Sequence, residues 1–271
     1  MAILSRILVF PIKSLDPIAL DEVTITSGGS LTGDREFAIF DQNGHYVNGK
    51  RNSKIHLIRA SYDLDSRMVS LHIQNQSEVC TFHLDKERAS LVNWFSIFLG
   101  KPVELRQNVT NGFPDDPDAW GATVVSEASL KTVQSWYEHS QIDLEQIRRR
   151  FRTNLEIADT EAFWEDQLFA KSGETVPFTI GDVQFLGINP CQRCSVPTRD
   201  PFSGSVYPEF QKTFTSQRES SLPDNVERSR FNHFYRFALN TRIPLTEAGK
   251  VLRLGDAVSF RSAKKPRFQK T

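Results

Sequence analysis

Short apolar runs separated by glycine, proline and asparagine turns dominate the first hundred residues and predict a strand-rich fold. The runs are rich in β-branched and aromatic side chains, and the tetrapeptide Asp41-Gln-Asn-Gly44 predicts a hairpin turn between two of them. The strands predicted in this part cover residues 7–10, 20–26, 36–40, 45–47, 57–64, 69–73 and 103–106, and the hairpin turn joins residues 36–40 to 45–47. We therefore expect the N-terminal part to be a domain of short strands.

Helical periodicity is confined to a few segments. The clearest covers residues 86–99, where apolar side chains recur every three or four positions and Gly100 follows as a stop. Ser126 is a predicted N-cap of a second helix, and residues 143–149 are predicted as a shorter third helix.

A stretch rich in turn formers and acidic residues, residues 111–118, is the predicted domain boundary. It divides the chain into residues 1–118 and residues 119–271. In the second part, residues 216–232 are polar and charged, and we interpret them as a helix or a mobile insertion. The strands predicted there, for a barrel or a mixed sheet, cover residues 122–125, 178–188 and 251–260. The expected fold class is α+β and β-rich.

Charge and cysteine content limit the possible partners. Lys plus Arg equals Asp plus Glu at 33 each, so no net field favours nucleic acid or an anionic membrane. The three cysteines, Cys80, Cys191 and Cys194, form no disulfide framework, which indicates a reducing, cytoplasmic location. They are also one too few for a four-thiolate iron–sulfur cluster, so electrons for redox chemistry are expected from a separate protein.

The N-terminal run of residues 1–10 is apolar, but Ser5 and Arg6 interrupt it. It is too short for a membrane span, and it lacks the basic start and the cleavage site of a secretory signal. We interpret it as a strand and expect no membrane span.

The segment Asn189-Pro-Cys-Gln-Arg-Cys194 carries the strongest local signal for chemistry. Structural zinc needs two further ligands, and no second cysteine pair or close histidine pair exists. A thioredoxin-like cysteine pair usually lies at the start of a helix, whereas Pro197 and Pro201 follow the pair here. The simplest interpretation of an isolated pair is two loop thiols without a functional role. Because Arg193 between the cysteines favours the thiolate that binds soft metals, we predict a metal or reactive-thiol site.

Scattered residues form a second candidate group, suited to binding an anion. They are Lys13, Ser14, Arg35, Ser126, Arg152 and Asn154. Ser126 stands at a predicted helix N-terminus, where free backbone N–H groups suit phosphate. Arg152 and Asn154 are predicted to share one face of a strand. Each residue alone is more often a solvated charge or a routine cap.

General acid–base candidates are weak. We expect no catalytic base among the histidines, His45, His56, His72, His83, His139 and His233. Asp200 has two equal interpretations, an acid that orients a substrate or a turn residue before Pro201.

Taken in order, six motifs resemble MOSC-domain proteins, and most closely the branch of amidoxime-reducing components with its bacterial relatives. They are Phe10-Pro-Ile-Lys-Ser14, Gly33-Asp-Arg35, Ser126-Glu-Ala-Ser-Leu130, Phe151-Arg-Thr-Asn154, Asn189-Pro-Cys-Gln-Arg-Cys194 and Leu254-Gly-Asp256. The resemblance extends from about residue 3 to residue 261. It implies an N-terminal strand-rich, β-barrel-like domain packed on a C-terminal MOSC β-barrel domain with peripheral helices, and a cofactor between them.

The resemblance also implies a molybdenum cofactor, whose metal is held by two pterin dithiolene sulfurs and one cysteine thiolate. That thiolate falls on Cys194, while no ligand role passes to Cys191. The cofactor contacts implied by similarity are Lys13, Ser14 and Arg35 from the N-terminal part and Ser126, Arg152, Asn154 and Arg193 from the C-terminal part. Arg193 would offset negative charge on the sulfur-rich centre.

The implied activity is reduction of N-hydroxylated or other N-oxygenated compounds, with electrons from a separate flavin-, ferredoxin- or cytochrome-type protein. The alternative is a cofactor carrier or sulfur-transfer module without reductase activity. The sequence departs from the eukaryotic pattern at Ser195-Val-Pro-Thr198, which bears on substrate contacts. We also expect neither the membrane anchor of the eukaryotic members nor the ferredoxin-like extension of some bacterial ones.

Overall fold

A computed structural model describes residues 1–137, 140 and 142–260 of the chain. His139 and the end of the predicted second domain, from residue 261, lie outside the described residues. In the part that is described, short strands predominate and helices are few, in agreement with the predicted α+β, β-rich class.

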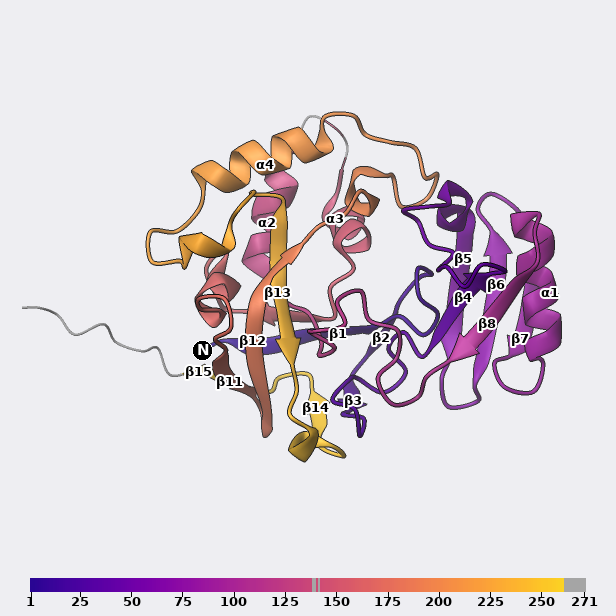
Figure 1. The fold of residues 1–271 in the computed structure, drawn as a ribbon, viewed down its shortest axis with the longest axis horizontal. Helices are drawn as coiled ribbons and strands as arrows, with labels where there is room; N and C mark the ends of the chain where they lie inside the picture. Colours follow the sequence, from indigo (N-terminus) through magenta and orange to yellow (C-terminus); the bar gives the residue numbers. More distant parts are fainter. Residues whose placement is uncertain (138–139, 141, 261–271) are drawn as a thin grey trace, which may run out of the picture.

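An eight-stranded sheet draws its strands from both ends of the chain (Figure 1). Its order is β15 (Val258–Phe260), β11 (Val176–Ile180), β12 (Val183–Gln192), β13 (Arg236–Arg242), β9 (Val124–Ser126), β10 (Leu155–Ala158), β1 (Ile3–Val9) and β2 (Ile18–Leu20). Neighbours run antiparallel except β9 and β10, which are parallel. An isolated bridge between Ile3 and Ala257 brings the β1 and β15 sides together, so the sheet curls without closing into a regular barrel within the described residues.

The N-terminal part holds two smaller sheets beside one helix, at the right of Figure 1. They comprise β4 (Phe37–Asp41) with β8 (Val103–Gln107), and β5 (Ile58–Asp63), β6 (Met68–Ile73) and β7 (Val79–His83) in a meander. Helix α1 (Arg88–Leu99) buries Leu91, Phe95 and Leu99 in a separate core with these strands, and it ends at Gly100 in the left-handed conformation. Strands β3 (Glu22–Thr24) and β14 (Val251–Arg253) form a separate two-stranded antiparallel sheet.

Three helices, α2 (Glu127–Ser135), α3 (Leu144–Phe151) and α4 (Phe210–Ser220), pack near one another against the large sheet (Figure 1). Aromatic side chains fill the interface, among them Phe151 from α3, Phe214 from α4 and Phe237 from β13. The α3 helix ends directly before Arg152, so this packing also fixes where that residue stands. None of the described helices combines the length and apolar character needed to cross a bilayer.

Several predicted boundaries were wrong. Residues 178–188 and 251–260 are each two strands rather than one. Of the segment 216–232, predicted as a helix or a mobile insertion, the first residues belong to the end of helix α4, and a short 3-10 turn, Arg228–Arg230, follows. Strands β7 and β13 had no counterpart in the predicted elements. The division between residues 118 and 119 stays a prediction, although β1 pairs with β10 in the large sheet.

Candidate functional site

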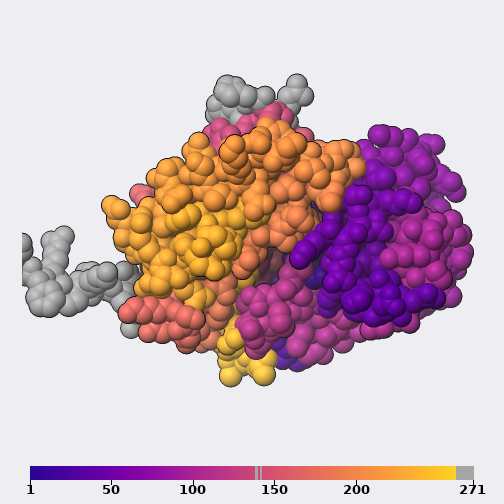
Figure 2. Space-filling view, turned by 45° about the horizontal axis from the view of Figure 1, so that its top comes forward, coloured from indigo at the N-terminus to yellow at the C-terminus, as the bar shows by residue number. Residues whose placement is uncertain are grey.

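A cavity of about 890 Å³ lies where loops from distant parts of the chain meet. In the space-filling view, the indigo N-terminal surface adjoins the orange surface of residues near 200 (Figure 2). The lining comes mainly from residues within 13–17, 34–35, 48–59, 111–123, 149–154 and 189–201. The predicted metal-binding cysteine and most predicted anion-binding residues therefore share one cavity.

The cavity lining is strongly basic although the chain as a whole is neutral. Four acidic side chains reach it, against eleven basic ones: Lys13, Arg35, Lys50, Arg59, Arg149, Arg150, Arg152, Arg193, Arg199, Arg230 and Arg236. This local excess creates a positive potential that favours an anionic ligand.

The loop after β1 and the residues before β4 form the N-terminal wall of the cavity. The backbone N–H of Lys13 donates to Phe37 O (2.7 Å), and that of Arg35 donates to Phe10 O (2.8 Å), so the two segments are tied together. Ser14 and Arg35 both adopt the left-handed conformation, with φ of 75° and 49°. Non-glycine residues rarely do so, and such strain is concentrated at functional sites.

Arg152 lines the cavity next to this wall and is the left-handed C-cap of α3, with φ of 52°. Its guanidinium stacks 4.2 Å from the Phe10 ring and donates to Leu15 O (2.7 Å). Among the described residues it forms no ion pair with a carboxylate. Burial, together with the nearby charge of Arg35, lowers the pKa of Arg152 to about 10. The cavity therefore contains a desolvated cation that forms no direct ion pair with a carboxylate of the described residues, although the charges of Asp16 and Asp115 act on it from farther away.

The predicted strand face shared by Arg152 and Asn154 was wrong, since Arg152 caps a helix and Asn154 precedes β10. Both residues nevertheless line the cavity. The Asn154 side chain donates to Leu8 O (3.0 Å) and accepts from Thr123 N (3.1 Å) and from Arg35 Nη1 (3.4 Å). Its amide thus connects β1, the segment at Thr123 and Arg35.

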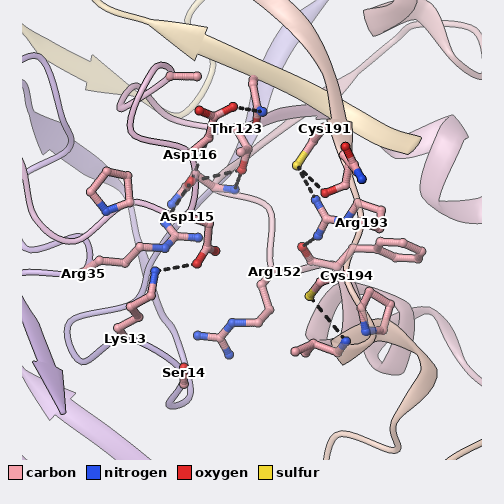
Figure 3. Close-up of a pocket in the computed structure, with 18 of the residues that line it drawn as sticks. Lys13, Ser14, Arg35, Asp115, Asp116, Thr123, Arg152, Cys191, Arg193 and Cys194 are labelled. Carbon is pink, nitrogen blue, oxygen red and sulfur yellow. Dashed lines mark hydrogen bonds and ion pairs between the residues drawn. The ribbon is translucent and has the colours of Figure 1, made fainter. Parts of the chain in front are cut away.

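Both cysteines of the motif face the cavity (Figure 3). The guanidinium of Arg193 donates to Cys191 Sγ (3.0 Å) and to Phe151 O, so it lies against Cys191 and the end of α3. The Cys194 side chain is exposed, and its Sγ accepts from Val196 N (3.4 Å). Of the two thiols, that of Cys194 is therefore the more accessible to a ligand.

Lys13 reaches into the cavity from a buried position. Its Nζ donates to Phe113 O (2.8 Å) and to Asp115 Oδ1 (2.5 Å). Burial lowers the pKa of Lys13, and the charge of Asp115 opposes this effect. The amine thus pairs with a carboxylate from the turn-rich segment predicted as the domain boundary.

The other interpretations of the cysteine pair find little support. Groups of three or more His, Cys, Asp or Glu side chains suited to a metal are absent from the described residues. Cys191 belongs to β12, and Cys194 follows that strand before a 3-10 turn, Val196–Thr198. The pair therefore does not open a helix of the redox-active type.

Ser126 is the one predicted contact that the structure does not bring to the cavity. It is fully buried, and its hydroxyl caps α2 by accepting from Ala128 N (3.1 Å) and Ser129 N (3.4 Å). The hydroxyl also donates to Glu161 O (3.1 Å). The predicted cap is confirmed, but the helix N-terminus is occupied by the protein's own groups.

Asp200 also lies outside the cavity lining. Its carboxylate accepts from Phe202 N (3.1 Å) and Ser203 N (2.8 Å), which is the arrangement of a turn residue. His56 does line the cavity, and burial lowers its pKa to about 4, so the ring is neutral at physiological pH.

Several lining residues had no sequence signal of their own. Asp115 stood in a segment that we had interpreted only as a boundary, and Arg59, Arg199 and Arg236 are isolated in the sequence. A lone arginine is usually a surface charge, so only the folded arrangement identifies these residues.

Comparison with known proteins identifies two family models along the chain. The MOSC N-terminal beta barrel domain matches residues 1–97, and the MOSC domain matches residues 121–259, just over half of the 271 residues.

Similar proteins include the molybdenum cofactor sulfurase of Danio rerio, 27% identical over 71% of this chain and 28% of the relative. The mitochondrial amidoxime reducing component 2 of Bos taurus is 23% identical over 83% of this chain and 74% of the relative. The mitochondrial amidoxime-reducing component 1 of Danio rerio is 24% identical over 75% of this chain and 70% of the relative. The chain thus spans less than a third of the sulfurase and most of each amidoxime reducing component. On the family matches, this chain belongs to the MOSC domain family.

Proposed function

We propose that this chain binds a molybdenum cofactor and uses it to reduce N-oxygenated compounds. The names of its relatives support both halves of the proposal, since one group is named for the molybdenum cofactor and the other for reducing amidoximes, which carry an N–O bond. The alignments cover 74% and 70% of the amidoxime reducing components but only 28% and 30% of the sulfurases, which favours the reductase.

The observation that carries the proposal is an exposed thiol in the same cavity as a partly buried guanidinium that has no direct ion pair among the described residues. Cys194 offers one thiolate, and no other metal-binding cluster stands among the described residues. A metal held here must therefore bring further ligands of its own, as a pterin dithiolene does. Arg152 needs an anion, and the terminal phosphate of the same cofactor would supply one. The residues present fit the cofactor.

Different residues of the chain are proposed to bind the metal and the pterin of the cofactor. Cys194 is the proposed metal ligand, and Lys13, Ser14, Arg35 and Arg152 are the proposed partners of the pterin and its phosphate. These four come from three separate segments, which would fix the orientation of the bound group.

Asn154 and Arg193 are proposed to act by positioning. The Asn154 amide already bonds Thr123, Leu8 and Arg35, so it fixes the wall on which Arg35 stands. Arg193 ties Cys191 to the end of α3 and thereby holds the loop that presents Cys194.

When bound, the cofactor would supply a two-electron centre able to take oxygen from an N–O bond. Converting a hydroxylamine-type nitrogen to an amine needs two electrons and two protons and releases water. Three cysteines do not suffice for an internal four-thiolate iron–sulfur cluster, so a separate flavin-, ferredoxin- or cytochrome-type protein is the proposed donor. The cytoplasmic location stays a prediction.

The proposal is tested with protein made in a host that synthesises the cofactor. Benzamidoxime or N-hydroxycytosine is supplied with a chemical reductant, and amine formation is measured for the wild type and for Cys194→Ser. We expect turnover by the wild type and none by the variant. Wild-type protein that contains molybdenum and pterin but is inactive on every N-oxygenated compound would contradict the reductase.

The second candidate is a cofactor carrier or sulfur-transfer module, favoured by the matches to sulfurases. A carrier should release intact cofactor to an apo-enzyme that depends on it and should show little reductase activity. Mixing loaded protein with such an acceptor, and assaying the acceptor, separates the two functions.

A further inference from the structure

The acidic segment beside the cavity has no role in the proposed function, yet one of its carboxylates contacts a cation of the anion site. Asp115 accepts a hydrogen bond from Lys13 Nζ at 2.5 Å (Figure 3). Although partial desolvation by the cavity walls acts to raise the pKa of Asp115, the charges of Lys13 and Arg35 hold this pKa well below its usual range. The carboxylate is therefore ionised at physiological pH.

Asp115 is held loosely compared with the other carboxylate of this region. Asp34 accepts from Phe10 N (2.9 Å) and pairs with Arg35, and its side chain is 11% exposed. The Asp115 side chain is 80% exposed, and among the described residues its carboxylate accepts a hydrogen bond from Lys13 alone. Asp34 is thus held by two contacts in a largely buried position, whereas Asp115 is held by one contact in an exposed position.

The backbone around Asp115 is anchored independently of its carboxylate. Phe113 N donates to Arg35 O (2.9 Å), and the Asp116 carboxylate accepts from Asn240 Nδ2 (3.2 Å). Rotation of the Asp115 side chain alone is therefore enough to release Lys13, and no loop needs to open.

We propose that Asp115 is an exchangeable internal anion, which occupies Lys13 in the empty protein and gives way to a phosphate group. A phosphate that binds Lys13, Arg35 and Arg152 would stand close to the Asp115 carboxylate, and like charges at such range repel. Since a phosphate monoester carries close to two negative charges, it outcompetes a single carboxylate for this cluster. In the empty state Asp115 offsets part of the repulsion among the three cations.

This inference rests on the proposed anion site, but it concerns a residue of the chain and is tested without turnover. Full-length protein is made in a host that lacks the cofactor, and inorganic phosphate binding is measured by calorimetry. The variants are Asp115→Asn and Asp115→Ala. The control is Asp118→Asn, which removes the same charge from the same segment, and whose carboxylate makes no hydrogen bond or ion pair within the described residues.

Both Asp115 variants should bind phosphate at least about five-fold more tightly than the wild type, and Asp118→Asn should leave the affinity unchanged. Thermal unfolding of each variant verifies its fold. An unchanged or weaker phosphate affinity in folded Asp115 variants would overturn the inference, as would the absence of binding in every protein.

Failure of the inference and failure of the proposed function are distinguishable. Wild-type protein from a cofactor-producing host that contains molybdenum and pterin, combined with Asp115 variants of unchanged phosphate affinity, would refute only the exchange. Protein without molybdenum and pterin would refute the proposed function.

Discussion

Replacing Arg152 by methionine should stabilise the cofactor-free protein while weakening its affinity for anions. In the folded state burial and Arg35 lower the pKa of Arg152 from 12.5 to about 10. At 1.36 kcal/mol per pH unit, this fall corresponds to about 3 kcal/mol against the charged form. The fold therefore carries a cost at this position that a neutral side chain of similar length avoids.

Part of that gain is lost with the interactions that the guanidinium makes. The hydrogen bond to Leu15 O contributes about 1 kcal/mol, and stacking over Phe10 contributes about another 1 kcal/mol. The balance leaves Arg152→Met more stable by about 1 kcal/mol, a rise of roughly 2–4 °C in Tm. Losing one charge-assisted bond of about 1.5–3 kcal/mol should weaken phosphate binding roughly ten- to hundred-fold.

The assay combines urea unfolding of cofactor-free protein in phosphate-free buffer with calorimetric titration of inorganic phosphate. Arg149→Met is the matched control, because Arg149 lines the same cavity but pairs with Asp16 (2.9 Å) and Glu145 (3.2 Å). We expect no gain in stability from that control. An Arg152→Met protein destabilised by more than about 2 kcal/mol, with unchanged phosphate affinity, would refute the reasoning, since Arg152 would then serve the fold rather than a ligand.

Three further predictions concern stability. The pKa of His56 in the folded state is lowered to about 4, so the folded protein binds fewer protons than the unfolded one. The free energy of unfolding should therefore decrease by at most about 3 kcal/mol as the pH falls from 6.5 to 4. In urea titrations at pH 7 and pH 4.5, His56→Gln should show a smaller decrease than the wild type, and an equal decrease would contradict the prediction. Asn154→Ala should cost about 2–4 kcal/mol in urea unfolding, since Thr123 N and Leu8 O lose a partner, and a change below about 0.5 kcal/mol would count against the positioning role. Burial raises the pKa of Glu165, so the folded protein loses stability as the pH rises and this carboxyl group ionises. The fall in Tm from pH 6 to pH 9 should therefore be smaller in Glu165→Gln than in the wild type. An equal fall in both proteins would contradict this prediction.

Local signals in the sequence predicted several elements well. Gly100 ends α1 in the left-handed conformation, and Ser126 caps α2, because both devices act within one turn of helix. The basic residues Lys13, Arg35 and Arg152 also meet in one cavity, as the resemblance had implied.

The remaining features depend on contacts distant in sequence. Strand β13 lies between β12 and β9, and its pairing involves residues more than a hundred positions away, which no local pattern reports. Arg152 was predicted on a strand because its neighbours alternate, but the packing of α3 extends the helix up to that residue. The sequence indicated only that Asp115 lies in a linker, whereas in the folded chain its carboxylate contacts Lys13.

The most direct test of the account is the molybdenum and pterin content of protein purified from a cofactor-producing host. Wild type, Cys194→Ser and Cys191→Ser are compared, with circular dichroism as the check on folding. We predict stoichiometric metal in the wild type, near-complete loss in Cys194→Ser, and substantial retention in Cys191→Ser, whose thiol contacts Arg193 instead. A folded Cys194→Ser protein that retains its molybdenum would contradict the central claim.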